Sequence, residues 1–103
     1  MPFANTQSIL VNEMNLDTKL STPPQVMSRL VGDETVLLDL ASGIYFGLDG
    51  VGKRIWETVT EGRSLEETAT IITAEFEVNE AQAQADVIEF ARNLVERGLL
   101  KVP

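Results

Sequence analysis

The side chains that could do acid–base chemistry in this sequence are mostly carboxylates. Glu66 and Glu67 are adjacent, and Glu75 and Glu77 are two positions apart. Side chains at either spacing do not face each other on a helix. Neither pair therefore predicts two carboxyls that share a proton or the flanking acids of a glycosidase.

The residue types that are missing exclude more chemistry. The chain has no cysteine and no histidine, which excludes thiolate nucleophiles, disulfides, thiolate zinc sites and imidazole bases. Glu57 and Glu61 lie four positions apart and could chelate a cation, but no further oxygen ligands accompany them. The glycines lack the spacing of a phosphate-binding loop. We expect no catalytic residue, no metal site and no cofactor, and hence no enzyme.

The charge balance argues against a nucleic-acid partner. The chain has eight basic and 16 acidic residues, which gives a net charge of -8. Lys53 and Arg54 form the only adjacent basic pair. Between Glu61 and Arg97 there are nine acids and three bases, most simply explained as a solvated helix face. Such a chain should repel a phosphate backbone.

The termini and hydropathy indicate a cytoplasmic protein. Residues 1–16 contain no Lys or Arg, which is unlike a signal or transit peptide. No apolar run approaches the ~20 residues of a membrane helix. We therefore expect neither export nor a membrane partner.

The elements that position these residues begin after a polar N-terminal stretch. A chain of 103 residues with 44% hydrophobic residues suits one core. Residues 1–24 end in Thr22-Pro23-Pro24 and predict a flexible tail, so that residues 25–103 form the domain. Residues 8–11 and 14–16 are apolar enough to form a strand, and pairing of residues 9–16 with an open sheet edge leaves autoinhibition or a swapped homodimer open.

Three short strands are predicted to follow the tail. They cover residues 26–31, 35–40 and 44–48, separated by turn residues around Gly32 and Gly43. The short turns favour an antiparallel meander. Alternation groups one set of apolar residues on each of the last two strands, and we expect helices to cover them: Val36, Leu38 and Leu40; Ile44, Phe46 and Leu48.

Three helices are predicted after the strands. Asp49 precedes a helix that ends at Gly62, Ser64 begins a Ser-x-x-Glu capping box for a helix over residues 65–76, and Asn79 caps a third helix that ends before Gly98. Leu99 and Leu100 are expected to fold back onto the core. Strands followed by helices define an α+β fold.

These segments together resemble a known family. The residues that carry the resemblance are Val36–Asp49, Gly52, Ile55 with Trp56, Gly62–Glu67, Phe76 with Val78, and Asp86-Val87 through Arg97–Leu100. From about Pro24 to Leu100 the pattern is similar to the PqqD-like family. That family includes the leader-peptide recognition domains, or RiPP recognition elements, of ribosomally made, modified peptides.

The resemblance implies a fold and a function. The fold would be winged helix-turn-helix-like, a three-stranded antiparallel β-meander followed by a three-helix bundle. The leader of a precursor peptide would add as a strand beside the third strand, against the third helix. The protein would then deliver the peptide to a separate modifying enzyme, such as a radical maturase, a cyclase or a protease.

The residues themselves support this strand addition. The third predicted strand carries no proline or charge that would block its edge. Its expected peptide-binding residues are Gly43, Ile44, Tyr45, Phe46, Gly47 and Leu48. Gly47 would allow close backbone approach, and Tyr45 would cover the incoming peptide. The side chains of Ile44, Phe46 and Leu48 are more simply explained as core.

The third predicted helix supplies the other wall of the expected groove. Its expected peptide-binding residues are Ala83, Asp86, Val87, Phe90, Ala91 and Leu94. Small Ala83 and Ala91 would leave hollows, and Asp86 with Glu89 would meet a basic residue of the peptide. Ordinary core is the plainer interpretation of Val87, Phe90 and Leu94.

Other functions stay open from the sequence. A winged-helix DNA-binding or regulatory domain shares the predicted elements, although the acidic helices count against it. An acidic carrier protein would need an Asp-Ser-Leu at a helix start, whereas Ser64 follows Arg63. A purely structural subunit is the remaining alternative.

Overall fold

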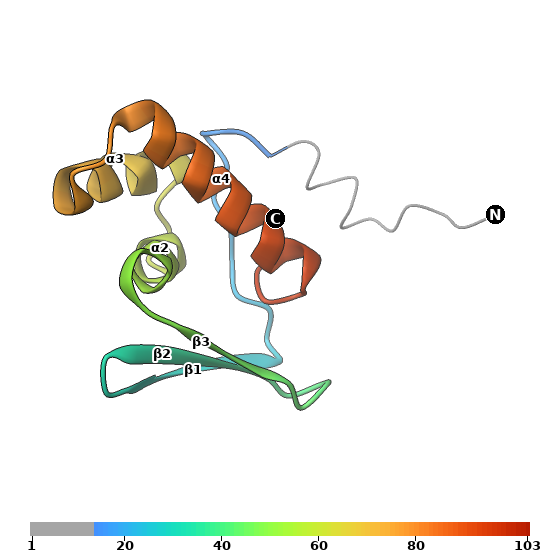
Figure 1. Cartoon of the computed structure of the whole chain (residues 1–103). Coiled ribbons are helices and arrows are strands. Elements are labelled where there is room, and N and C mark those ends of the chain that lie inside the picture. Colours follow the sequence, from blue (N-terminus) through green and yellow to red (C-terminus); the bar gives the residue numbers. More distant parts are fainter. Residues whose placement is uncertain (1–13) are drawn as a thin grey trace.

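The computed structural model describes residues 14–103. The elements are β1 (Val26–Val31), β2 (Glu34–Asp39), β3 (Tyr45–Leu48), α2 (Gly50–Thr60), α3 (Leu65–Phe76) and α4 (Glu80–Glu96). The strands form one antiparallel sheet in the order β1-β2-β3, and the helices lie over one of its faces (Figure 1). The predicted α+β fold, a meander followed by three helices, is confirmed. No helix within residues 14–103 is both long and apolar enough to cross a membrane.

Tight turns set the register of the sheet. Val31 pairs with Glu34 across a two-residue turn, whose Gly32 has a φ of 60°, a conformation that glycine adopts without steric cost. Gly43 has a φ of 75° in the second turn. The glycines predicted to close the turns therefore occupy positions that favour glycine.

The predicted helix starts are present, with one difference in chemistry. Ser64 Oγ accepts from Glu67 N at 3.1 Å, and Glu67 Oε1 accepts from Ser64 N at 2.9 Å, which completes the capping box. Asn79 Oδ1 accepts from Gln82 N at 2.8 Å at the start of α4. Asp49 occupies the N-cap position of α2, but its carboxylate makes no cap hydrogen bond.

The face of β2 that packs against the helices differs from the prediction. Thr35 and Leu37 face the helices and are 7% and 0% exposed, and they pair with Leu48 and Phe46 of β3. Alternation therefore places Val36 and Leu38, and Leu40 just beyond the strand, away from the helices. Val36, Leu37 and Leu38 are all aliphatic, so periodicity alone could not decide which face the helices cover.

The segment before β1 is also packed, contrary to the prediction of a tail up to residue 24. Leu20 is 5% exposed and belongs to the core. Thr18 O accepts from Leu65 N at 3.0 Å, and Leu16 O accepts from Glu66 N at 2.9 Å. These carbonyls satisfy N–H groups at the start of α3 that have no partner within the helix.

The C-terminal residues complete the core. Leu99 and Leu100 are 0% and 1% exposed, as predicted for a chain that folds back. Lys101 and Ser21 form an isolated antiparallel bridge, with N···O distances of 3.0 and 2.8 Å. The two ends of the described chain are therefore held side by side.

Candidate peptide-binding edge and groove

One long edge of the sheet, along β3, is unpaired in the part of the chain that the structure describes. β3 is a terminal strand. Asp39 N donates to Ile44 O at 2.9 Å, so Ile44, and with a period of two Phe46 and Leu48, direct their backbone groups toward β2. Tyr45 and Gly47 must then direct their N–H and C=O groups outward. We call these four groups the free edge of β3.

The side chains of β3 alternate around this edge. Phe46 lies on the helix-covered face, is half-buried and packs against the core. Tyr45 points to the opposite face and is 71% exposed. Ile44 lies just before the strand and is 55% exposed. A strand added here would thus meet an aromatic ring on each face.

One row of side chains, on α4 and at its C-cap, faces the same region. Asp86, Phe90, Asn93 and Arg97 recur at helical spacing. Phe90 contacts the first turn of α2, since a Cβ at Gly52 would lie 3.2 Å from its ring. At the other end, the guanidinium carbon of Arg97 lies 5.3 Å from the centroid of the Phe46 ring, within the range of a cation–π contact.

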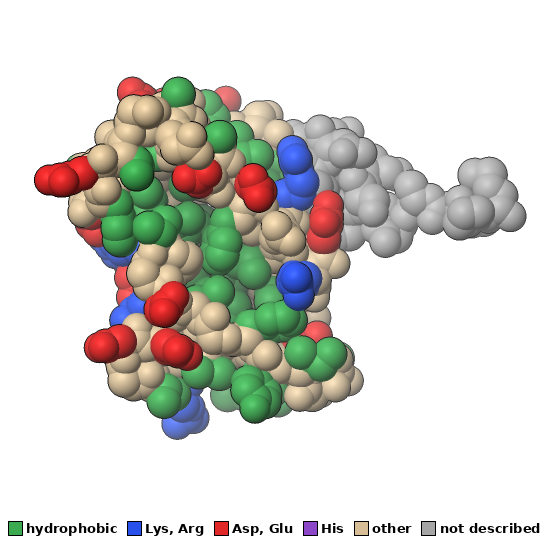
Figure 2. Space-filling view, viewed as in Figure 1, with side chains coloured by type: hydrophobic (Ala, Val, Ile, Leu, Met, Phe, Trp, Pro, Cys, Tyr) green, Lys and Arg blue, Asp and Glu red, His purple; other side chains and the backbone are tan. Residues whose placement is uncertain are grey.

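Together, β3 and this row border a recess. Figure 2 shows an apolar recess between the sheet and the helices, with charged side chains on its rim. Partly buried Phe46, Val51 and Phe90 pack against the core at this side of the molecule. We call the surface between the free edge of β3 and the row from Asp86 to Arg97 the groove.

The structure divides the predicted residues of α4 into two groups. Ala83, Val87 and Ala91 are each 0% exposed, and Leu94 is 5% exposed. The hollows expected beside Ala83 and Ala91 are absent, because neighbouring core side chains fill the space around both methyl groups. Asp86 and Phe90 remain at the groove. Sequence reasoning missed Arg97 and Asn93, although both continue the helical spacing from Phe90.

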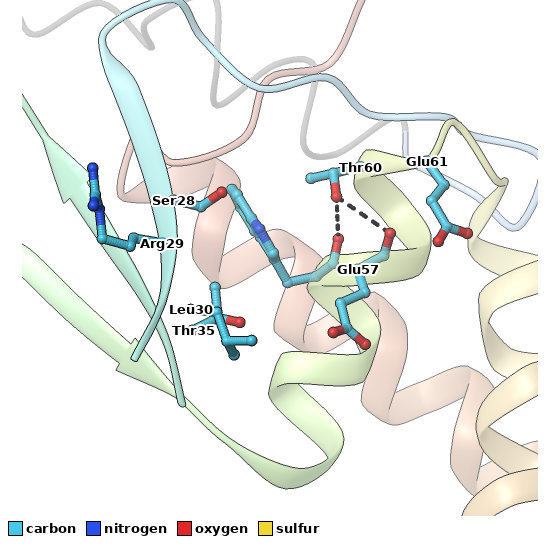
Figure 3. Close-up of a pocket in the computed structure, with 8 residues that line it drawn as sticks. Ser28, Arg29, Leu30, Thr35, Glu57, Thr60 and Glu61 are labelled. Carbon is cyan, nitrogen blue, oxygen red and sulfur yellow. Dashed lines mark hydrogen bonds between the residues drawn. The ribbon is translucent and has the colours of Figure 1, made fainter. Parts of the chain in front are cut away.

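Two cavities lie outside the groove. The larger, about 350 Å³, lies between β1 and α2 (Figure 3). The smaller, about 210 Å³, lies on the outer face of β1 and β2. The larger cavity is lined by Ser28, Arg29, Leu30, Thr35, Trp56, Glu57, Thr60 and Glu61.

Three polar side chains of the larger cavity, all on α2 or at its end, are engaged within the protein. Thr60 Oγ1 donates toward Trp56 O and Glu57 O at 2.8 and 3.2 Å. Glu57 pairs with Arg54 at 3.4 Å, and Glu61 pairs with Arg63 at 3.3 Å. The two glutamates considered as a cation chelate therefore have arginine partners. Within residues 14–103, no three acidic side chains gather where they could hold a metal ion.

Carboxylates elsewhere serve structural contacts. Glu75 accepts from Arg54 through both oxygens, at 2.9 and 3.0 Å, and so joins α3 to α2. This hydrogen-bonded pair raises the pKa of Arg54. The Ser64 backbone N–H lowers the pKa of Glu67. Both shifts result from hydrogen bonds of the helices, between Arg54 and Glu75 and between Ser64 and Glu67, which lie away from the groove.

A three-stranded meander whose outer edge is open, followed by three helices over one face, defines a winged-helix-type fold. Residues 34–100 match the family Coenzyme PQQ synthesis protein D (PqqD). The match spans more than half of the chain, which therefore belongs to the PqqD family. No curated protein sequence is significantly similar to the chain.

Solved structures agree with this family. The structure of TbiB1 in complex with the TbiA(beta) leader peptide is 41% identical, with a TM-score of 0.74, and the match covers 78% of this chain and 93% of TbiB1. A lasso peptide synthetase B1 complexed with its leader peptide is 27% identical, with a TM-score of 0.76 and coverages of 80% and 96%.

A third structure shares the fold. It is the solution structure of the PqqD part of Methylobacterium extorquens PqqCD, described as a stand-alone RiPP recognition element. Its identity is 20%, its TM-score is 0.69, and the match covers 85% of this chain and 94% of that one. The winged-helix-type architecture is thus common to all three.

Proposed function

We propose that this protein binds the leader segment of a ribosomally made precursor peptide and presents it to a separate modifying enzyme. The observation that carries the proposal is the free edge of β3, which borders the groove in a chain of the PqqD family. The protein contributes binding, and the enzyme contributes the chemistry. A radical maturase, a cyclase or a protease fits this role.

The backbone supplies affinity in this proposal. The N–H and C=O groups of Tyr45 and Gly47 offer four hydrogen bonds to an added strand, each with a net contribution of roughly 0.5–1.5 kcal/mol. These bonds do not depend on the peptide's side chains. Phe46 and Phe90 in the groove, and Tyr45 on the opposite face, supply the side-chain contacts that read sequence.

The two leader-peptide complexes support a precursor of lasso type. One is a lasso peptide synthetase B1, and both are more similar to this chain than the Methylobacterium extorquens PqqD part is. The expected substrate is therefore a gene-encoded peptide with an extended leader, and the expected partner is the enzyme that matures it.

A proline scan of the two edge strands tests the proposal. Phage-displayed random peptides are enriched on the wild-type protein, and the affinity of the best peptide is measured by fluorescence anisotropy. Gly47→Pro removes an outward N–H of β3 while leaving the bonds to β2 in place. We expect the affinity to fall by about tenfold or more, because a hydrogen bond is lost and the ring obstructs the added strand.

Two matched variants control for the substitution itself. Gly47→Ala keeps the N–H, and its Cβ meets only the exposed end of Glu34, whose Oε1 would lie at 2.6 Å. Ser28→Pro removes an outward N–H from the opposite edge, on β1. Both should bind within about twofold of wild type. Equal binding by Gly47→Pro, or equal loss in Ser28→Pro, would refute addition at β3.

A chemical-shift map provides a second measurement. The enriched peptide should perturb NMR signals from Gly43 to Leu48 and along the row from Asp86 to Arg97. Signals of α3 should change little, because α3 lies behind α4 and α2 rather than at the groove (Figure 1). The largest changes at β1 or α3 would contradict the assignment of the groove.

A further inference from the structure

The groove has acidic side chains at one end and a basic side chain at the other. This arrangement bears on which peptides the groove selects in the proposed binding function. Where β3 leads into α2, two carboxylates border the groove: Asp49, exposed and without a cap hydrogen bond, and Asp86, one turn before Phe90. In Figure 2, acidic side chains gather at the lower left of the recess and also lie along its upper rim, while basic side chains lie on its right rim with acidic ones beside them.

The opposite end of the groove is basic. Arg97 follows α4 and stacks over Phe46, near the beginning of β3. Its guanidinium has no ion pair within residues 14–103, unlike those of Arg54 and Arg63. The cation is therefore held in place by an aromatic ring while its charge stays available to a ligand.

The acidic end is likewise not neutralised within the described chain. Asp49 and Asp86 form no ion pair there; Asp86 accepts from the neutral amide of Gln82 at 2.7 Å. Lys53 is the lysine closest in sequence to Asp49. Its ammonium group donates a hydrogen bond to the carbonyl oxygen of Asp33 at 3.2 Å.

The direction of an added strand follows from the sheet. β1, β2 and β3 are antiparallel, and a further antiparallel strand keeps the sheet in its more stable pairing. Such a strand enters beside Leu48 and leaves beside Tyr45. Its N-terminal residues therefore pass the acidic end and its C-terminal residues pass Arg97.

We propose that the groove selects peptides by the order of their charges, a specificity that rests on the proposed function. A Lys or Arg comes first and meets Asp49 or Asp86. An Asp or Glu follows about two to four residues later, since β3 has four residues and each strand residue advances about 3.4 Å, and it meets Arg97. Apolar residues between them contact Phe46 and Phe90.

The test repeats the phage selection on four proteins: wild type, Arg97→Glu, Asp86→Lys and Arg29→Glu. Arg29 lies on β1, at the far edge of the sheet, so its variant carries the same charge change as Arg97→Glu away from the groove. Wild type and Arg29→Glu should enrich peptides with a basic residue before an acidic one. Arg97→Glu should lose the acidic preference at the later position, and Asp86→Lys should weaken the basic preference at the earlier one.

Affinities of two synthetic peptides complete the test. One is an enriched peptide, and the other has its basic and acidic residues exchanged, so that composition is constant. Wild type should bind the enriched peptide about three- to tenfold more tightly than the exchanged one, the range expected for two exposed charge pairs. Arg97→Glu should reduce this ratio, and added salt should reduce it in wild type.

Each outcome decides a separate point. Enrichment without charge order, or the same order in Arg97→Glu, overturns the charge selection and leaves strand addition standing. Enrichment of peptides with the acidic residue first also overturns the charge selection, because it contradicts the antiparallel direction of the added strand. No enrichment above the unselected library overturns the proposed peptide binding and the charge selection with it.

Discussion

Thr58 and Thr68 show how single polar residues hold the helices together. Both are 0% exposed, and their hydroxyl oxygens lie 3.1 Å apart at the contact between α2 and α3. Thr58 Oγ1 also lies 3.0 Å from the carbonyl oxygen of Ile55, to which it can donate. Thr68 has no other side-chain hydrogen bond among the described contacts, so its hydroxyl depends on Thr58.

The two threonines should therefore differ in their contribution to stability. Thr58→Val leaves the Thr68 hydroxyl buried without its partner and should lower the free energy of unfolding by about 1–3 kcal/mol. Thr68→Val should cost less, because Thr58 still donates to Ile55 O. Urea denaturation of both variants and of the double variant measures this. An equal cost for the two single variants would contradict the dependence of the Thr68 hydroxyl on Thr58.

At the scale of elements, the start of α3 is the most fully capped helix terminus. The Ser64 and Glu67 capping box is joined by the carbonyls of Leu16 and Thr18, which come from the segment before β1. A local sequence signal and a distant chain segment thus satisfy the same group of N–H donors. Only the local half of this arrangement could be predicted from the sequence.

The capping box predicts a pH dependence of stability. The pKa of Glu67 is lowered by its hydrogen bond from the Ser64 backbone N–H. The stabilisation is thus fully present above the unfolded pKa of about 4.5 and is lost as the pH falls through the lower folded value. The difference in unfolding free energy between wild type and Glu67→Gln should shrink from about pH 7 to about pH 3.

A neighbouring residue provides the control for this pH dependence. Glu66 lies in the same first turn, is exposed, and makes no side-chain cap contact. Glu66→Gln should differ from wild type by a smaller amount across the same range. Urea denaturation at several pH values measures both differences, and parallel curves for the two variants would contradict the role of the capping box.

At the scale of the whole molecule, chain ends close the core. Leu20 before β1 and Leu99–Leu100 after α4 are buried together in one cluster, and Ser21 pairs with Lys101. The folded unit therefore begins before residue 25. Within the strand-capable stretch of residues 9–16, residues 14–16 form no strand, and Leu16 accepts a hydrogen bond from the start of α3. Residues 9–13 lie outside the described residues, so autoinhibition and a swapped homodimer through them stay predictions.

Two truncations separate these contributions. Deleting residues 1–20 removes Leu20 and the carbonyls that cap α3, and should lower the free energy of unfolding by at least the ~2–5 kcal/mol of a buried leucine. Deleting residues 1–13 keeps all of these contacts and should lower the thermal midpoint by less than deleting residues 1–20 does. Calorimetry measures both, and an equally stable 21–103 fragment would contradict the packed role of the segment.

The shorter truncation also tests the N-terminal predictions. If residues 9–13 occupy the free edge of β3, the 14–103 protein should bind the enriched peptide more tightly than the full chain. If they exchange between copies, its mass by light scattering should fall. Unchanged affinity and mass would dispose of both.

The sequence by itself determined the order of strands and helices, their turns and two of their caps. These features depend on residues within a few positions of one another, such as Gly32 in its turn and Ser64 with Glu67. It also indicated β3 as an edge free of proline and charge. Local backbone preferences are strong enough at these points to be recognised without knowledge of the fold.

Only the tertiary structure decided which residues meet across the molecule. It placed Leu37 rather than Val36 and Leu38 against the helices, buried Ala83 and Ala91 in the core, and brought Arg97 onto Phe46. Three consecutive aliphatic residues leave the covered face of a strand undetermined, and the side of α4 that borders β3 depends on how the helices pack. Long-range packing selects among faces that local periodicity makes equivalent.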